Sequence, residues 1–120
     1  MLVFKKNVII YESSERLDDS LRIIQDCSIS HEYKDGKGWI MLDKSIDSIS
    51  WHAFSGSAIE SIVTPEAITE IDSWTFENCA NLTKVSLPHH LKAIRGNAFT
   101  NCVSLSSIFI PAGTDSECCP

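Results

Sequence analysis

The second half of the chain repeats itself with a period of 23 residues, and this period limits the possible folds more than any other feature of the sequence. The copy that starts at Ile71 returns in the copy that starts at Ile94. The recurring positions are Ile71, Phe76, Cys79, Leu82, Val85, Leu87 and Pro88, which return as Ile94, Phe99, Cys102, Leu105, Ile108, Ile110 and Pro111. A period of about 20 to 50 residues indicates a solenoid or another stacked array.

A third copy lies upstream of these two. It is one residue short between Phe54 and Ile59, so its first part is offset by 22 residues from the next copy and its second part by 23. The residues that carry this copy are Ile49, Phe54, Ile59, Ile62, Thr64, Pro65 and Ile68.

Each copy contains the pattern of a strand that is followed by a turn. In Leu82-x-x-Val85-x-Leu87 the alternation predicts a strand whose Val85 and Leu87 side chains face inward. Pro88 is expected to end the strand, because proline has no N–H to donate to a continuing ladder. The strands of successive copies are expected to pair as a parallel sheet, roughly 4.7–4.9 Å apart.

Phe54, Phe76 and Phe99 occupy one repeat position and are expected to stack as an aromatic column inside the array. Each unit of such an array buries its apolar residues mainly against its neighbours, so the column is predicted to be core. Cys79 and Cys102 also share one position, and we interpret them as small buried hydrophobes.

These features resemble the BspA-like class of leucine-rich repeats, from Ile46 to about Thr114. The residues that carry the resemblance are Ile68, Ile71, Thr75, Phe76, Cys79, Leu82, Val85, Leu87 and Pro88, with their next copies to Pro111. The resemblance implies a β-rich, α/β-type solenoid: a short right-handed leucine-rich repeat array of three to four coils with an N-terminal cap. It also implies a bacterial cell-surface or secreted protein with an adhesin-like, host-interaction role.

The predicted organisation has three parts. Residues 1–37 are expected to form the N-terminal cap, because a repeat array needs an atypical unit over its exposed apolar end. Residues 38–114 are expected to form the repeats, with a partial coil at 38–48 and coils at 49–70, 71–93 and 94–114. Residues 115–120 are expected to form a C-terminal tail.

Within the cap, a strand is predicted at 8–11 and a short helix from Ser13 or Ser14 to Ile24. Asp35-Gly36 is a strong signal for a hairpin turn. The segment 39–42 is interpreted as the strand of one further coil, with its alternating residues matching those of the later copies.

Composition excludes several classes of partner. The formal net charge is -6, the pI is about 5.0, and no Lys/Arg cluster occurs. This balance argues against nucleic acid and against an anionic membrane surface as partners. No run approaches a membrane span, and Met1 to Tyr11 holds no signal-peptide core of about 7 to 15 apolar residues. We therefore expect no membrane insertion, and either a cytoplasmic protein or the mature form of a secreted one.

The sequence indicates no catalytic or metal site and no cofactor. His89 and His90 are neighbours after a proline, so their side chains are expected to diverge, whereas metal ligands must converge. The five cysteines form no C-x-x-C pair, which removes the usual zinc and redox signals. Cys118 and Cys119 are read as formers of intermolecular disulfides or as inert.

Binding is the function class that remains. Two outward-facing columns are predicted on the concave sheet face, one with Met41, Val63, Ser86 and Phe109 and the other with Trp39, Ser61, Lys84 and Ser107. The candidate binding residues are Trp39, Met41, Val63, Lys84, Ser86 and Phe109. The competing interpretation is that these residues are filler, because β-branched and aromatic side chains simply suit strands.

The sequence therefore predicts a non-catalytic module that binds a protein or glycan ligand through its concave face. The alternative is a structural unit that associates with itself through an open terminal coil, since an uncovered strand edge invites pairing.

Overall fold

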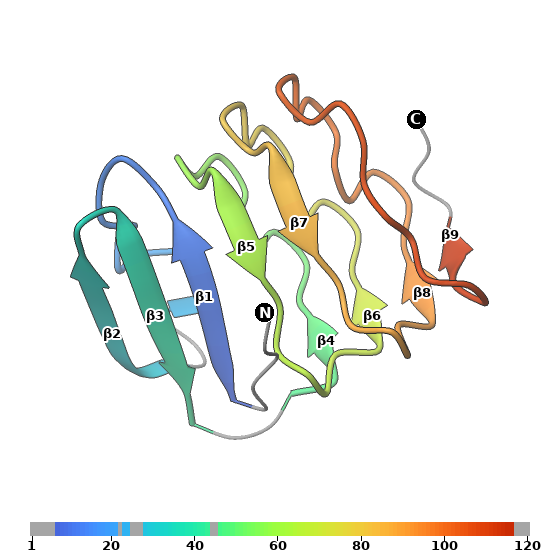
Figure 1. The fold of residues 1–120 in the computed structure, drawn as a ribbon, viewed down its shortest axis with the longest axis horizontal. Helices are drawn as coiled ribbons and strands as arrows, with labels where there is room; N and C mark the ends of the chain where they lie inside the picture. The colour runs from blue at the N-terminus through green and yellow to red at the C-terminus, as the bar shows by residue number, and fades with distance from the viewer. Residues whose placement is uncertain (1–6, 22, 25–27, 44–45, 117–120) are drawn as a thin grey trace.

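Two sheets run along the repeats and share one core (Figure 1). The structure is a computed structural model that describes residues 7–21, 23–24, 28–43 and 46–116. The larger sheet has five strands in the order β2-β3-β1-β5-β7, and the smaller sheet has four in the order β4-β6-β8-β9. Their bounds are β1 Val8–Glu12, β2 Ser28–Lys34, β3 Lys37–Leu42, β4 Ser48–Ile49, β5 Ser61–Val63, β6 Glu70–Ile71, β7 Lys84–Ser86, β8 Ala93–Ile94 and β9 Asp115–Ser116.

The repeat is visible as parallel strand pairs between copies. β5 pairs with β7 in a register that sets Ile62 opposite Val85, which is the 23-residue offset. In the smaller sheet β4 pairs with β6, β6 with β8 and β8 with β9, all parallel. Ile49, Ile71 and Ile94 meet in this way and are fully buried. The expected β-rich repeat fold is thus present, while its right-handed sense and its number of coils stay predictions.

The predicted phenylalanine column is confirmed. The Phe54 and Phe76 rings lie 5.4 Å apart between centroids and within 6° of parallel, and the Phe76 and Phe99 rings lie 5.1 Å apart within 9°. Phe54 and Phe76 are fully buried, whereas Phe99 in the last copy is partly buried. Stacked apolar rings of this kind form the interior that each copy cannot complete alone.

Side-chain hydrogen bonds tie each copy to the one before it. The Cys79 thiol donates to the Phe54 carbonyl at 3.1 Å, and the Cys102 thiol donates to the Phe76 carbonyl at 3.0 Å. The Thr75 hydroxyl likewise lies within hydrogen-bond distance of carbonyl oxygens in the preceding copy. Burial raises the pKa of the Cys79 thiol and raises that of Cys102 to about 11. Both thiols are therefore part of the scaffold at neutral pH, because only the thiolate is a good nucleophile.

The first three strands form an antiparallel unit that extends the five-stranded sheet. β1 lies between β3 and β5 and is antiparallel to both. The predicted hairpin joins β2 to β3 through Asp35 and Gly36, whose φ angles of 52° and 85° are those of a two-residue turn with both central residues left-handed. Gly38 is required in β3, because a Cβ at that position would collide with the Tyr11 ring.

The prediction that residues 39–42 form the strand of a further coil is wrong. β3 pairs antiparallel with β1 and β2, so β1 and not β3 lies beside the first repeat strand. The alternation of apolar residues in this segment reports one buried face, but it carries no information about strand direction. The two-residue turn before β3 fixes the direction, since such a turn joins antiparallel strands.

The predicted helix from Ser13 to Ile24 is also wrong. Among the described residues of this stretch, only 23–24 are helical, and residues 13–21 are irregular, with bends at 14–15 and 21 and a turn at 19–20. The Ser20 N–H donates to the Asp18 carboxylate at 2.8 Å, and such a side-chain turn competes with helical hydrogen bonds. The apolar residues that suggested a helix are nevertheless core, since Leu17 and Ile24 are buried.

The last copy is less buried than the copy before it. Leu82, Val85 and Leu87 are buried, but their equivalents Leu105, Ile108 and Ile110 are only partly buried. Residues 105–110 form no strand beside β7. In the described residues, no helix is long and apolar enough to cross a membrane.

Candidate binding surface

The outer face of the five-stranded sheet carries an apolar row across four strands. Ile10 of β1 pairs with Trp39 of β3 on one side and with Val63 of β5 on the other. Val63 in turn pairs with Ser86 of β7. Ile10, Trp39, Val63 and Ser86 all alternate with buried neighbours, so their side chains share the outward face. We call these four residues the outer row.

A polar row runs beside the outer row. Lys37, Glu12, Ser61 and Lys84 follow one another across β3, β1, β5 and β7. The Ser61 hydroxyl donates to the Glu12 carboxylate at 2.8 Å, and the Lys37 ammonium lies 5.6 Å from the centre of the Trp39 ring. The charges therefore alternate in sign beside an apolar strip, with Lys37 held over the tryptophan by a cation–π contact.

The structure corrects the predicted columns. Val63 and Ser86 share a row as expected, but Met41 pairs with Val8 and lies outside that row. Trp39, which was assigned to the other column, is the residue that aligns with Val63 through Ile10. Because β1 intervenes, Trp39 and Val63 lie two strands apart, about 10 Å.

The six predicted residues differ in their exposure. Phe109 is 73% exposed and lies outside the assigned strands, and Met41 is 39% exposed. Lys84 is also exposed. The half-buried residues are Trp39, Val63 and Ser86. Ile10 and Glu12 were not predicted, although the alternation in Val8–Glu12 marks both as outward-facing once β1 is placed in the sheet.

A hydrogen-bond network with Tyr11 of β1 and His31 of β2 lies on the inner side of the sheet and reaches the surface at Asp19 and Arg16. The Leu17 N–H donates to the Tyr11 hydroxyl oxygen at 3.3 Å, and the same oxygen lies 2.6 Å from His31 Nε2. On the other side of the ring, His31 Nδ1 lies 3.0 Å from the Asp19 carboxylate, which as an ionised group can only accept. Arg16 completes the chain with an ion pair to Asp19 at 3.1 Å.

At its buried end this network ties β1 to β2 and to the segment 16–19. Tyr11 is fully buried, and burial raises the pKa of its hydroxyl. The hydrogen bond from His31 and then that from Arg16 hold the pKa of the Asp19 carboxyl below its usual value. The Tyr11 oxygen has both of its contacts inside the protein, so the arrangement orders side chains and does not present a nucleophile.

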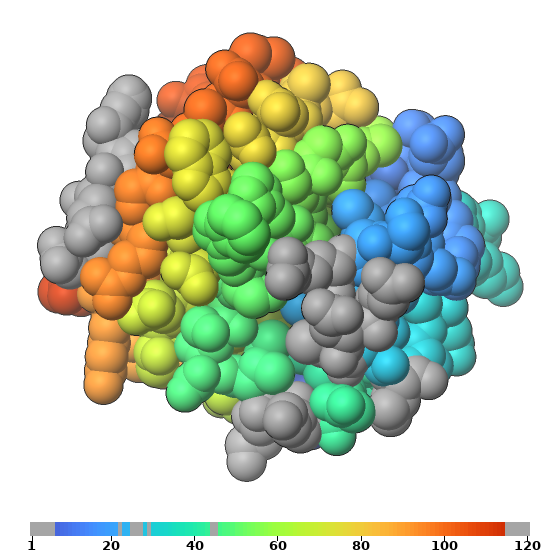
Figure 2. Space-filling view, turned by 180° about the vertical axis from the view of Figure 1, so that it is seen from behind, coloured from blue at the N-terminus to red at the C-terminus, as the bar shows by residue number. Residues whose placement is uncertain are grey.

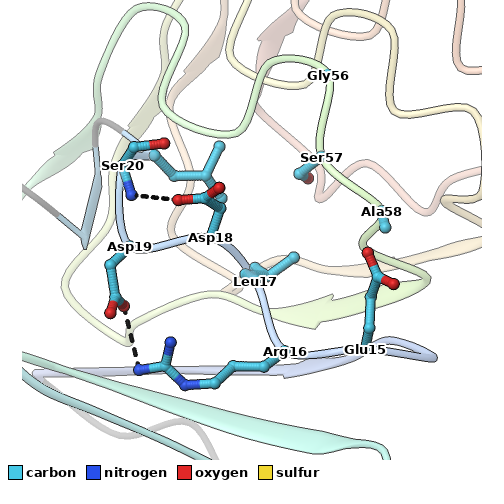
Figure 3. A pocket seen from close by; sticks show the side chains of 10 residues that line it. Glu15, Arg16, Leu17, Asp18, Asp19, Ser20, Gly56, Ser57 and Ala58 are labelled. Carbon is cyan, nitrogen blue, oxygen red and sulfur yellow. Dashed lines mark hydrogen bonds and ion pairs between the residues drawn. The ribbon is translucent and has the colours of Figure 1, made fainter.

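A polar pocket of about 660 Å³ lies between the segment 15–21 and the turn 56–58 (Figure 3). Arg16 on its wall is paired with Asp19, and Asp18 accepts a hydrogen bond from the Ser20 N–H, as the figure shows. Glu15 adds a third carboxylate to the lining. The pocket is acidic and already internally hydrogen-bonded, so it contributes negative potential rather than an obvious reaction centre.

No group of three or more His, Cys, Asp or Glu side chains in the described residues could hold a metal ion. His89 and His90 are both exposed in the turn after Pro88. The predictions for Cys118 and Cys119 concern positions outside the described residues.

Comparison with known proteins is consistent with this geometry. A family model described as "BspA type Leucine rich repeat region (6 copies)" matches residues 10–116. No curated protein matches the chain.

Two solved structures share the fold. A leucine-rich repeat protein of T. pallidum is 30% identical with a TM-score of 0.55, over 59% of this chain and 34% of that one. A leucine-rich repeat protein from Bacteroides ovatus ATCC 8483 is 32% identical with a TM-score of 0.55, over 69% of this chain and 20% of that one. The chain thus spans about a third and a fifth of the length of these two proteins.

Proposed function

Because the chain belongs to the BspA-type leucine-rich repeat family, we propose that it is a non-catalytic module that binds a protein partner through the outer face of its five-stranded sheet. The family typically mediates protein interaction and is generally non-catalytic. A bacterial, adhesin-like role is part of this proposal, and the two repeat proteins that share the fold come from bacteria.

The outer row is the observation that carries the proposal. Trp39, Ile10 and Val63 form a half-buried apolar strip, and Lys37 and Glu12 flank it with charge. Protein interfaces commonly combine an apolar, aromatic centre with a polar rim. Tryptophan is also among the residues that dominate binding energy when they are buried at the centre of a contact.

The test is binding of the purified chain to a panel of purified host extracellular-matrix and mucosal proteins. For a partner found in this way, Trp39→Ala is expected to lower affinity at least about tenfold, which is the loss typical of a central aromatic residue. Trp39→Phe keeps an apolar ring and is expected to retain most of the affinity.

Val103→Ser is the matched control, because Val103 is 78% exposed and lies outside the sheet. It should bind like the unmodified chain. The proposal fails if Trp39→Ala binds normally, or if its loss of binding merely follows a fall in melting temperature. A glycan ligand is the competing form of the proposal, and enzymatic deglycosylation of the partner decides between them: binding to a protein surface survives it.

Self-association is a second candidate, and the exposed apolar residues of the last copy favour it. Phe109 is 73% exposed, and Leu105, Ile108 and Ile110 are only partly buried. Two such surfaces packed together would remove apolar area from water. Sedimentation velocity over a wide range of concentrations tests this: Phe109→Ser should weaken the dimer, and a strict monomer at every concentration rules it out.

A further inference from the structure

The face opposite the outer row carries a group of aromatic side chains that lies outside the proposed site. Trp51, His52 and Trp74 come from equivalent turns of two successive copies, and Ser55 and Glu77 lie beside them. We call these five residues the aromatic patch. The two turns belong to the green and yellow segments that adjoin on the surface seen from behind in Figure 2.

The aromatic rings of the patch contact one another. The Trp51 and His52 ring centres lie 4.1 Å apart, edge to face. The His52 and Trp74 rings lie 6.3 Å apart and within 13° of parallel. Trp51 is 50% exposed, so a large apolar side chain presents half of its surface to solvent.

The backbone φ angles indicate that the turn does not itself require an aromatic residue at this position. His52 and Trp74 adopt φ angles of 61° and 62°, and the equivalent residue of the third copy, Asn97, adopts 63°. All three copies therefore need a left-handed residue at this position. Asparagine and histidine accommodate that conformation comparatively well, whereas it is unusual for a bulky residue such as Trp74. A strained aromatic residue on an exposed turn points to a role beyond packing.

A carboxylate completes the patch. Glu77 Oε1 lies 3.5 Å from His52 Nδ1 and accepts a hydrogen bond from the Ser55 hydroxyl at 3.2 Å. These contacts fix one carboxylate oxygen beside the aromatic rings, and about a quarter of the Glu77 side chain stays exposed. The neighbouring polar pocket begins at Gly56, directly after Ser55, and adds the carboxylates of Asp18 and Asp19 to the same side.

We propose that the aromatic patch binds a cationic side chain, lysine or arginine, of a partner protein. Faces of tryptophan rings attract ammonium and guanidinium groups, and a guanidinium also stacks flat on them. Glu77 supplies the opposite charge at the edge of the rings, and the net charge of -6 favours the approach of a cation. This proposal takes one statement from the proposed function, namely that the partner is a protein.

A sugar ring is the other ligand that could stack on exposed tryptophan. The cation is favoured because Glu77 is a charged group held in place beside the rings, and because the pocket next to it is acidic. A neutral sugar can donate hydroxyl hydrogen bonds to Glu77, but it carries no net charge for the surrounding negative potential to attract.

The experiment uses Nα-acetyl-argininamide as the probe and its neutral isostere Nα-acetyl-citrullinamide as the matched control. Titration is followed by NMR through the indole N–H signals of the three tryptophans. The signals of Trp51 and Trp74 should shift in a saturable way with the arginine probe, while the signal of Trp39 on the opposite face stays in place. The citrulline probe should bind about two- to fivefold more weakly or not at all, which is the scale of an exposed cation–π contact.

Two substitutions sharpen the result. Glu77→Gln keeps an acceptor for Ser55 but removes the charge, and it should weaken arginine binding about two- to fivefold. Trp51→Leu should weaken it by at least as much, because half of that ring is available to a ligand.

The proposal is overturned if the citrulline probe binds as well as the arginine probe, if Glu77→Gln leaves the affinity unchanged, or if a methyl glycoside binds more tightly than the cation. Trp39→Ala separates this proposal from the proposed function. It should lower the affinity of the outer row for its partner at least about tenfold and leave the arginine titration unaltered, so either proposal can fail while the other stands.

Discussion

The two ends of the repeat array differ in how well they bury the same kinds of residue. At the N-terminal end, β1 covers the first repeat strand, and its inward residues Ile9 and Tyr11 are fully buried. At the C-terminal end, residues 105–110 lie in the third copy without forming a strand, and Leu105 and Ile108 are only partly buried. Figure 1 shows this contrast between the antiparallel strands on one side and the irregular chain on the other.

The difference teaches that burial in this protein is set by the neighbouring copy rather than by residue type. Leu82 and Leu105 are the same residue at the same repeat position, yet the first is fully buried and the second is not. In a stacked array, stability is approximately the sum of each unit and its contacts with its neighbours. A residue at an end therefore contributes less than its equivalent in the middle.

The largest expected effect comes from the phenylalanine column. Phe76→Ala should destabilise the protein by about 3–5 kcal/mol, because the ring is fully buried between two others. Phe99→Ala in the last copy should cost roughly 1–2 kcal/mol, since that ring is already partly exposed. Denaturant unfolding measures both values, and equal losses would contradict the contrast between middle and end.

The next effect concerns the N-terminal unit. Tyr11→Phe should cost about 1–3 kcal/mol, because it leaves the Leu17 N–H and His31 Nε2 without their buried partner. Tyr33→Phe is the control: its hydroxyl donates to the Ser13 carbonyl at 2.8 Å from a less buried position and should cost less. Thermal and denaturant unfolding measure the loss of stability in the two variants. If Tyr33→Phe is the more destabilising change, the hydrogen bonds of Tyr11 are not the main stabilising contacts of this unit.

The column and the hairpin were accessible from sequence because they depend on local or periodic signals. The 23-residue period alone places Phe76 over Phe99, and Asp35-Gly36 alone predicts the two-residue turn. The position of β1 was not accessible, since an alternating strand does not reveal its neighbour. Trp39 was therefore selected as outward-facing but assigned to the wrong row.

The aromatic patch could not be predicted from the sequence for a different reason. Nothing in the sequence reveals the left-handed backbone of His52 or brings it beside Trp74. His52 and Trp74 do align at the 22-residue offset of the first part of the upstream copy, but the two residue types differ and form no recurring pattern. Comparison with Asn97 in the third copy is the signal that could have drawn attention to the position.

A smaller effect is expected from acid. The pKa of Asp19 is lowered in the folded protein, first by His31 and then by Arg16, so its contribution to stability is complete above the ordinary value of 3.8 and is lost as the pH falls through the folded value. The Asp19 side chain is 62% exposed, and solvent screening limits the contribution to about 0.5 kcal/mol or less. The difference in unfolding free energy between the unmodified chain and Asp19→Asn should therefore shrink below pH 3.8. A difference that stays constant down to pH 2 would mean that Asp19 is not titrating in the way its contacts imply.

The smallest effect is expected at the open end. Phe109→Ser and Val103→Ser should each change the unfolding free energy by no more than about 0.5 kcal/mol, because both side chains are more than two-thirds exposed. Chemical unfolding at low protein concentration measures this without interference from association. A loss comparable with that of Phe99→Ala would show that the last copy is better packed in solution than its exposure indicates.

The side-chain hydrogen bonds between copies have a consequence for how the protein is made. The thiols of Cys79 and Cys102 and the hydroxyl of Thr83 all donate to carbonyl groups of the copy that precedes them. A ribosome delivers the chain from its N-terminus, so each copy emerges with acceptors that its successor will satisfy. The Thr64 hydroxyl donates in the opposite sense, to the Ser86 carbonyl of the following copy, so each copy also emerges with donors that only its successor can satisfy.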